Sequence, residues 1–105
     1  MKMDSQLVLL LLNISEALGL GEVDLNNAKD LLDNREYGLA FDTIITQLYE
    51  YKIQIDKQVY RLIEKNANRM DISESSYSFM KELIRDKNII SISLRDQLEE
   101  ELKSL

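Results

Sequence analysis

Residues 5–20 read SQLVLLLLNISEALGL, and this stretch decides the predicted fold. One apolar face follows the three- and four-residue spacing of a helix, and other apolar residues widen it. The face consists of Leu7, Leu10, Leu11, Ile14 and Leu18, and it is widened by Leu9, Leu12 and Ala17. A helix this apolar is expected at the centre of a core. Gly19 and Gly21 are expected to end it, because glycine readily adopts the backbone conformation that follows a helix.

Five more helices are predicted downstream from residue spacing and capping signals. We expect them over about 24–34, 37–50, 56–70, 75–88 and 93–105. The expected N-caps are Asp24, Asp56, Asp71 in a capping box with Glu74 or its rival Ser73, and Ser93 in a box with Asp96. Asn88 is expected to break the fifth helix, and Ile89, Ile90 and Ile92 to form an extended or turn segment packed on the body. The predicted fold is all-α: a compact single-domain bundle of about six helices over residues 1–105.

Each of the later helices carries an apolar stripe. The stripes are Leu25, Ala28, Leu31 and Leu32; Phe41, Ile44, Ile45 and Leu48; Val59, Leu62, Ile63 and Met70; Tyr77, Met80, Leu83 and Ile84; and Leu94, Leu98, Leu102 and Leu105. Asn66 falls inside the third of these stripes, and buried polar groups are nearly always hydrogen-bonded. We therefore expect Asn66 to be a satisfied core amide.

Composition excludes several kinds of chemistry. The 105 residues include no Cys, no His and no Pro, and only 3 Gly. The missing Cys and His remove disulfides, thiol nucleophiles, imidazole bases and the usual metal ligands. The carboxylates lie on solvated helix faces, which lack the burial that perturbs pKa values at active sites. We therefore expect no metal, no cofactor and no catalytic residues, and an enzyme ranks last among the functions considered.

Acidic residues are concentrated in the first half of the chain. Residues 1–50 hold 9 acids and 3 bases, whereas residues 51–105 hold 10 of each, so the net charge of −6 comes from the first half. A protein that binds phosphates directly needs clustered Lys and Arg, so nucleic acid is not the expected partner. An acidic half suits a basic protein partner, because opposite potentials steer encounter. Solubility alone would explain the charge equally well.

No membrane segment is expected. The longest apolar run, Leu7 to Leu12, has six residues, against roughly 20 for a spanning helix. A signal peptide begins with a basic region, which the acidic Asp4 does not fit. Asn13, Ser15 and Glu16 then interrupt the apolar region that a signal peptide requires. The sequence therefore favours a cytoplasmic protein.

Three elements of the sequence resemble the MafI-like family of immunity proteins, the antidotes of polymorphic toxin and contact-dependent growth inhibition systems. The elements are EYGLAF at 36–41, QLYEY at 47–51 and YRLIE at 60–64. The likeness covers about Leu31 to Ile84, half of the chain. It implies a small cytoplasmic helical protein that binds the C-terminal toxin domain of a secreted effector, often a ribonuclease. The matched residues expected on apolar stripes or their edges are Tyr37, Leu39, Phe41, Leu48, Leu62 and Ile63. Gly38 is expected to permit a tight helix start or close packing.

The residues that contact a partner must therefore be predicted from the charge pattern. The predicted partner-binding residues are Asp30, Asp33, Asp42, Thr46, Tyr49 and Glu50, on polar faces of adjacent helices. They would cover a basic toxin nuclease and block it by stoichiometric occlusion. Glu99, Glu100 and Glu101 are expected to form an ordinary solvated face. The alternative function is a helical adaptor or regulator that binds a basic or amphipathic segment.

Overall fold

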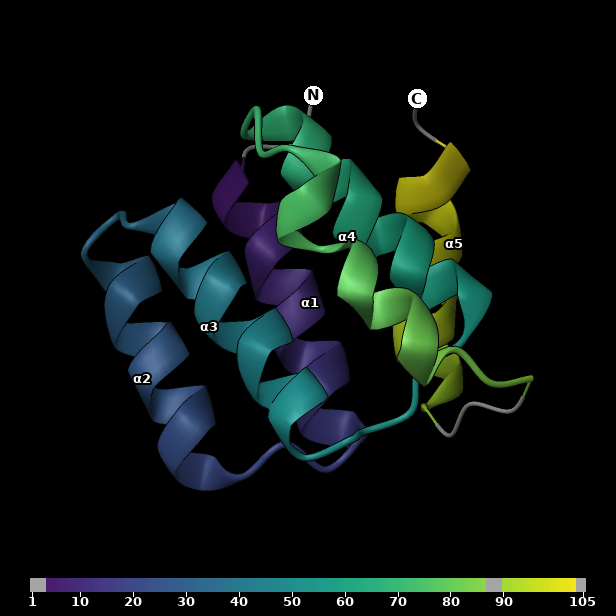
Figure 1. Cartoon of the computed structure of the whole chain (residues 1–105). Coiled ribbons are helices and arrows are strands. Elements are labelled where there is room, and N and C mark those ends of the chain that lie inside the picture. The colour runs from purple at the N-terminus through teal and green to yellow at the C-terminus, as the bar shows by residue number, and fades with distance from the viewer. Residues whose placement is uncertain (1–3, 87–89, 104–105) are drawn as a thin grey trace.

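The computed structural model describes residues 4–86 and 90–103, and within them it forms helices and no strand. The elements are α1 (Asp4–Ala17), α2 (Glu22–Asp33), α3 (Tyr37–Glu50), α4 (Lys57–Arg69), the 3₁₀ helices η1 (Glu74–Ser76) and η2 (Ser78–Leu83), and α5 (Ile92–Lys103) (Figure 1). The prediction of an all-α bundle of about six helices is confirmed. None of the described helices has the length and apolar character needed to cross a bilayer.

Helix α1 lies at the centre, as its sequence predicts. It packs against α2, α3, α4 and α5 (Figure 1), and Leu7, Val8, Leu11 and Ile14 are fully buried. The helix ends at Ala17, three residues before the predicted end. Gly19 takes a φ of 109° there, a conformation that glycine adopts without a Cβ clash.

Three later helices end in the same way without glycine. The residues with positive φ after α2, α3 and α4 are Arg35 (61°), Lys52 (54°) and Asp71 (57°). The next N–H in each turn donates to a carbonyl five residues back, at 2.8–2.9 Å, so the last carbonyls of each helix are satisfied. A left-handed conformation costs a non-glycine residue roughly 1–2 kcal/mol, which these hydrogen bonds and the packing around them must offset.

One of the predicted N-caps is right and others are displaced. The Asp56 carboxylate accepts the Val59 N–H at 2.8 Å and caps α4, as predicted. Asp24 is wrong as a cap, because α2 begins at Glu22, directly after the extended residue Gly21. Ser93 is also wrong: the Ser91 hydroxyl accepts the Leu94 N–H at 3.2 Å, two residues earlier.

The predicted fifth helix is two 3₁₀ helices instead. Tyr77, Met80 and Leu83 are buried at a strict spacing of three residues, which matches the period of a 3₁₀ helix. Asp71 belongs to the turn after α4, so it cannot form the predicted capping box. The chain after η2 runs beside Ile55, whose N–H donates to the Leu83 carbonyl at 3.0 Å.

Two expectations for the last part of the chain are also wrong. Ile92 is largely exposed as the first residue of α5 and does not form an extended segment on the body. Glu101 is buried in the contact between α5 and α4 and is not part of a solvated face. Ile90 is half-buried against the core. Asn88, Ile89 and Leu105 lie outside the described residues.

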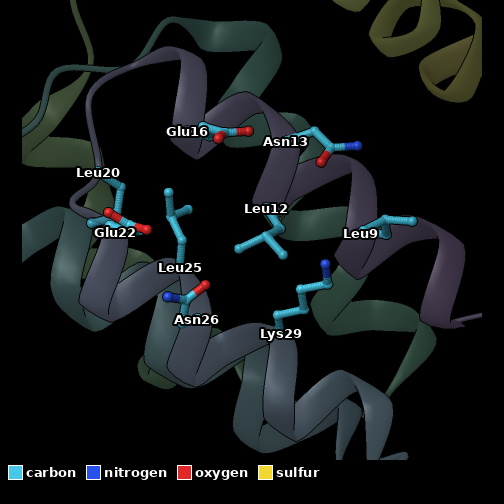
Figure 2. Close-up of a pocket in the computed structure, with 9 residues that line it drawn as sticks. All are labelled: Leu9, Leu12, Asn13, Glu16, Leu20, Glu22, Leu25, Asn26 and Lys29. Atoms are coloured by element: carbon cyan, nitrogen blue, oxygen red, sulfur yellow. The ribbon is translucent and has the colours of Figure 1, made fainter.

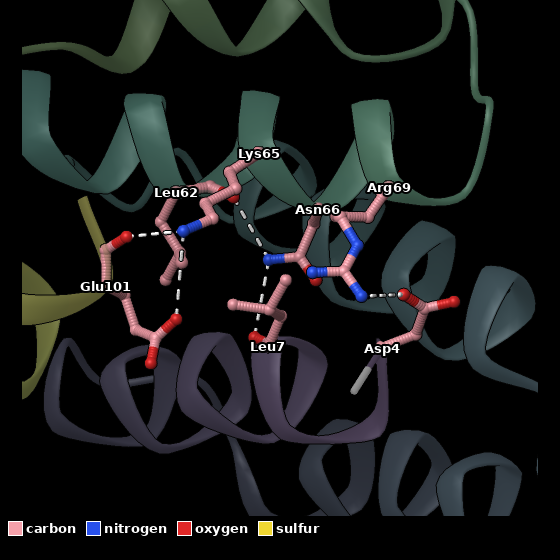
Figure 3. A network of polar contacts seen from close by, with 7 residues as sticks. All are labelled: Asp4, Leu7, Leu62, Lys65, Asn66, Arg69 and Glu101. Atoms are coloured by element: carbon pink, nitrogen blue, oxygen red, sulfur yellow. Dashed lines mark hydrogen bonds and ion pairs between the residues drawn. The ribbon is translucent and has the colours of Figure 1, made fainter. Parts of the chain in front are cut away.

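Polar contacts join α4 to its neighbours on two sides (Figure 3). The buried Asn66 amide nitrogen donates to the Leu62 carbonyl at 3.0 Å and to the Leu7 carbonyl of α1 at 3.3 Å. Asn66 is therefore a core amide as expected, but only its nitrogen is satisfied: its side-chain oxygen has no hydrogen-bond partner among the described residues, which the expectation of a satisfied amide did not foresee. Two ion pairs flank it: Lys65 with Glu101 at 3.8 Å and Arg69 with Asp4 at 3.6 Å.

Candidate functional site

Five of the six predicted partner-binding residues are exposed on two helices that pack side by side (Figure 1). Asp30 and Asp33 lie on α2, and Asp42, Thr46 and Glu50 lie on α3. The four-residue spacing of the α3 set places its members in one row along the helix. We call the four carboxylates Asp30, Asp33, Asp42 and Glu50 the acidic face. Within the described chain, no hydrogen bond or ion pair links the side chains on α2 to those on α3.

The acidic face is not neutralised locally. None of its carboxylates forms an ion pair with a described residue, whereas Asp4, Asp56 and Glu101 each pair with Arg or Lys. Unpaired exposed charges of one sign add up to a potential that attracts an oppositely charged surface. This part of the protein can therefore steer a basic partner.

Tyr49 is held differently from the other five. It is half-buried, and its hydroxyl donates to the Glu82 carboxylate at 3.0 Å. Its ring meets Phe79 edge to face at 5.0 Å, and the Lys52 ammonium lies 3.9 Å from the ring centroid. These contacts tie the end of α3 to η2, so the structure gives Tyr49 a packing role and leaves little of it for a partner.

Sequence reasoning missed a groove between α1 and α2 (Figure 2). Its volume is about 490 Å³, and it is lined by Leu9, Leu12, Asn13, Glu16, Leu20, Glu22, Leu25, Asn26 and Lys29. Leu9 is 46% exposed although it lies in the most apolar segment of the chain. A signal was present in the sequence: a helix with an apolar residue at every position from 7 to 12 carries more apolar surface than one core contact can cover.

A buried pair of tyrosines lies away from both surfaces. The rings of Tyr60 and Tyr77 are 6.1 Å apart, and the Tyr60 hydroxyl has no hydrogen-bond partner among the described residues. Burial, and to a smaller extent the nearby Glu64 carboxylate, raise the pKa of Tyr60 from 10.0 to about 12. Burial also raises the pKa of Tyr77. Both phenols therefore stay protonated at neutral pH and serve as packed rings.

No metal centre is evident in the described residues, where no group of three or more Asp or Glu side chains is placed to hold an ion. The motif residues Gly38 and Leu39 are on the surface: Leu39 is more than half exposed, and a Cβ at Gly38 would meet no atom within 4 Å. The expectations of close packing at Gly38 and of an apolar stripe at Leu39 are therefore wrong. Phe41, Leu48, Leu62 and Ile63 are buried as expected, and Tyr37 is half-buried. Comparison of the chain with family models, curated proteins and solved structures found no match.

Proposed function

We propose that this protein is an immunity protein, which binds a cognate bacterial toxin domain and neutralises it by stoichiometric occlusion. The observation that supports this most directly is the acidic face, four exposed carboxylates on α2 and α3 with no cation paired to them among the described residues. The resemblance of the three sequence elements to MafI-like proteins supports the same function.

The proposed target is a ribonuclease domain. An enzyme that cleaves RNA holds phosphates with a cationic surface. The exposed carboxylates of the acidic face would compete for that surface, and long-range attraction would speed the approach. Because the carboxylates stand on two packed helices, they need little reordering on binding, which lowers the entropic cost of association. In this mechanism the protein inhibits the ribonuclease by covering its substrate site and performs no chemistry of its own.

The proposal predicts a gene for a secreted effector beside this chain's gene, and the test uses the C-terminal domain of that effector. We expect a one-to-one complex on co-purification and loss of RNA cleavage at equimolar protein. The variant Asp30→Asn/Asp33→Asn/Asp42→Asn/Glu50→Gln should fold normally, because exposed charges contribute little to stability. Its association rate at low salt should fall by about tenfold, and its salt dependence should flatten.

The matched control is Asp71→Asn/Glu74→Gln/Asp86→Asn/Asp96→Asn, which removes four exposed carboxylates from the second half of the chain. It changes the net charge by the same amount but should keep the association rate within about twofold, because its sites lie off the acidic face. Absence of a complex would contradict the proposed function. An equal loss in both variants would show that net charge, and not the acidic face, governs binding.

A helical adaptor is the second candidate, and the groove between α1 and α2 is the observation that favours it. Helical grooves of this kind receive amphipathic segments. An adaptor would bind the same effector domain, or another protein, without stopping RNA cleavage. The cleavage assay in the presence of saturating protein therefore separates the two functions.

A further inference from the structure

The groove between α1 and α2 has the residue pattern of a binding site for a third helix. Its α1 wall is formed by residues 9, 12, 13 and 16, and its α2 wall by residues 22, 25, 26 and 29. Both sets follow the i, i+3, i+4, i+7 spacing of one helix face. Because the two helices are joined by a short turn at 18–21, residue 16 lies at the same end as residue 22, and residue 9 at the same end as residue 29. The walls thus run antiparallel in register.

Leucines line the middle of the groove, with Asn13 and Asn26 beside them (Figure 2). Leu12 and Leu25 point into it from opposite walls (Figure 2). Leu12 and Leu20 are buried, Leu25 is half-buried and Leu9 is 46% exposed. The volume of about 490 Å³ lies inside the range of roughly 300–1,000 Å³ that is typical of ligand pockets. An apolar side chain placed here would gain free energy by leaving water.

The two ends of the groove differ in charge. Glu16 and Glu22 stand on opposite walls at the end nearest the turn, and Lys29 stands beside Leu9 at the other end (Figure 2). Glu22 and Lys29 are seven residues apart, which is about 10 Å along a helix. A segment of two helical turns therefore spans the groove, with apolar residues at its centre and a cation at the end that meets the two carboxylates.

We propose that this groove docks a helical segment of the protein partner, which presents two apolar side chains at i and i+3 or i+4 with a Lys or Arg one turn away. The identity of that partner rests on the proposed function. Charge complementarity selects the segment: a Lys or Arg faces Glu16 and Glu22, whereas an Asp or Glu there would meet like charges. The groove shares α2 with Asp30 and Asp33 of the acidic face, so one basic partner can engage both surfaces.

Synthetic peptides test the segment chemistry without the effector. One peptide of about 15 residues, a length at which isolated helices begin to be stable, carries the Leu pair with a flanking Lys. A second has Glu in place of that Lys, and a third has Ser in place of both Leu. Titration into the full ¹⁵N-labelled chain should shift amide signals of residues 9–16 and 22–29 with the first peptide. The other two should bind at least about tenfold more weakly.

A matched pair of variants ties binding to the groove. Leu9→Glu and Val23→Glu each add one acid at an exposed apolar position, 46% and 73% exposed, but only Leu9 lines the groove. Leu9→Glu should weaken binding of the first peptide by about tenfold or more, because it places a charge on apolar surface. Val23→Glu should leave it unchanged or slightly tighter. Equal effects of the two variants, or peptide shifts outside the groove, would overturn the proposal.

Binding to the effector domain and self-association of the protein are the two remaining measurements that test the groove proposal. Peptide binding at the groove without a complex with the effector would contradict the proposed function and leave the groove proposal standing. A complex with the effector that Leu9→Glu does not weaken would overturn the groove proposal and leave the proposed function standing. A dimer in sedimentation that Leu9→Glu dissociates would also overturn it, because a second copy of the chain would then cover the groove.

Discussion

Lys65→Met is expected to lower the free energy of unfolding by about 3–5 kcal/mol, because it removes the Lys65 ammonium from a buried ion pair while the Glu101 carboxylate stays buried. The Lys65 ammonium lies 3.8 Å from the Glu101 carboxylate and also donates to the Glu101 carbonyl oxygen. The two side chains are only 10% and 7% exposed, in the contact that joins α4 to α5 (Figure 3). The double variant Lys65→Met/Glu101→Leu should recover most of the loss, because it removes both desolvated charges and keeps the volume.

The Asp4–Arg69 pair is the internal control for that prediction. It joins α4 to α1 at 3.6 Å, but its side chains are 34% and 32% exposed. Arg69→Met should therefore cost only about 0–1 kcal/mol. Urea denaturation followed by circular dichroism measures all three variants on one scale, provided that the slopes agree. A Lys65→Met loss no larger than that of Arg69→Met, or a double variant as unstable as the single one, would refute the reasoning from burial.

Two further predictions concern the core. Phe41→Ala and Leu62→Ala should lower the free energy of unfolding by about 3–5 and 2–5 kcal/mol, since both side chains are fully buried; near-neutral values in urea denaturation would contradict the assigned helix faces. Tyr60→Phe should raise it by about 1 kcal/mol, because it removes a buried hydroxyl without a partner. Below pH 10 both folded and unfolded Tyr60 keep the proton. Between pH 10 and about 12, the folded pKa of Tyr60, the unfolded chain loses this proton while the folded protein keeps it. Deprotonation then favours the unfolded chain, so the free energy of unfolding falls as pH rises. A plot of the free energy of unfolding of Tyr60→Phe against pH should lack the part of the loss above pH 10 that Tyr60 causes. A loss identical to that of the unsubstituted protein would contradict this prediction.

The apolar stripes could be predicted from the sequence because they depend on local spacing alone. Phe41, Ile44, Ile45 and Leu48 fall on one side of any α-helix, whatever lies beside it, and all four are buried. The cap at Asp56 was predictable for the same reason, since its carboxylate bonds an N–H only three residues ahead.

Helix ends were predicted less well where the usual signal was missing. Arg35, Lys52 and Asp71 adopt positive φ after three helices without being glycine, and only Asp71 is of a residue type that visits this conformation more often. The segment predicted as an α-helix before Asn88 instead forms η1 and η2, and its apolar residues Tyr77, Met80 and Leu83 did not reveal this, because a spacing of three residues occurs in both kinds of helix.

The sequence by itself determined the all-α class, the central place of the first helix and the excess of acids in the first half of the chain. Only the tertiary structure decided that Glu101 is buried while Glu100 is exposed, and that Leu9 remains in solvent beside Lys29. The physical reason is that helical period determines which residues share a face, whereas burial depends on which other helix lies against that face. The groove between α1 and α2 exists because α3, α4 and α5 pack on the other sides of α1 and leave Leu9 uncovered.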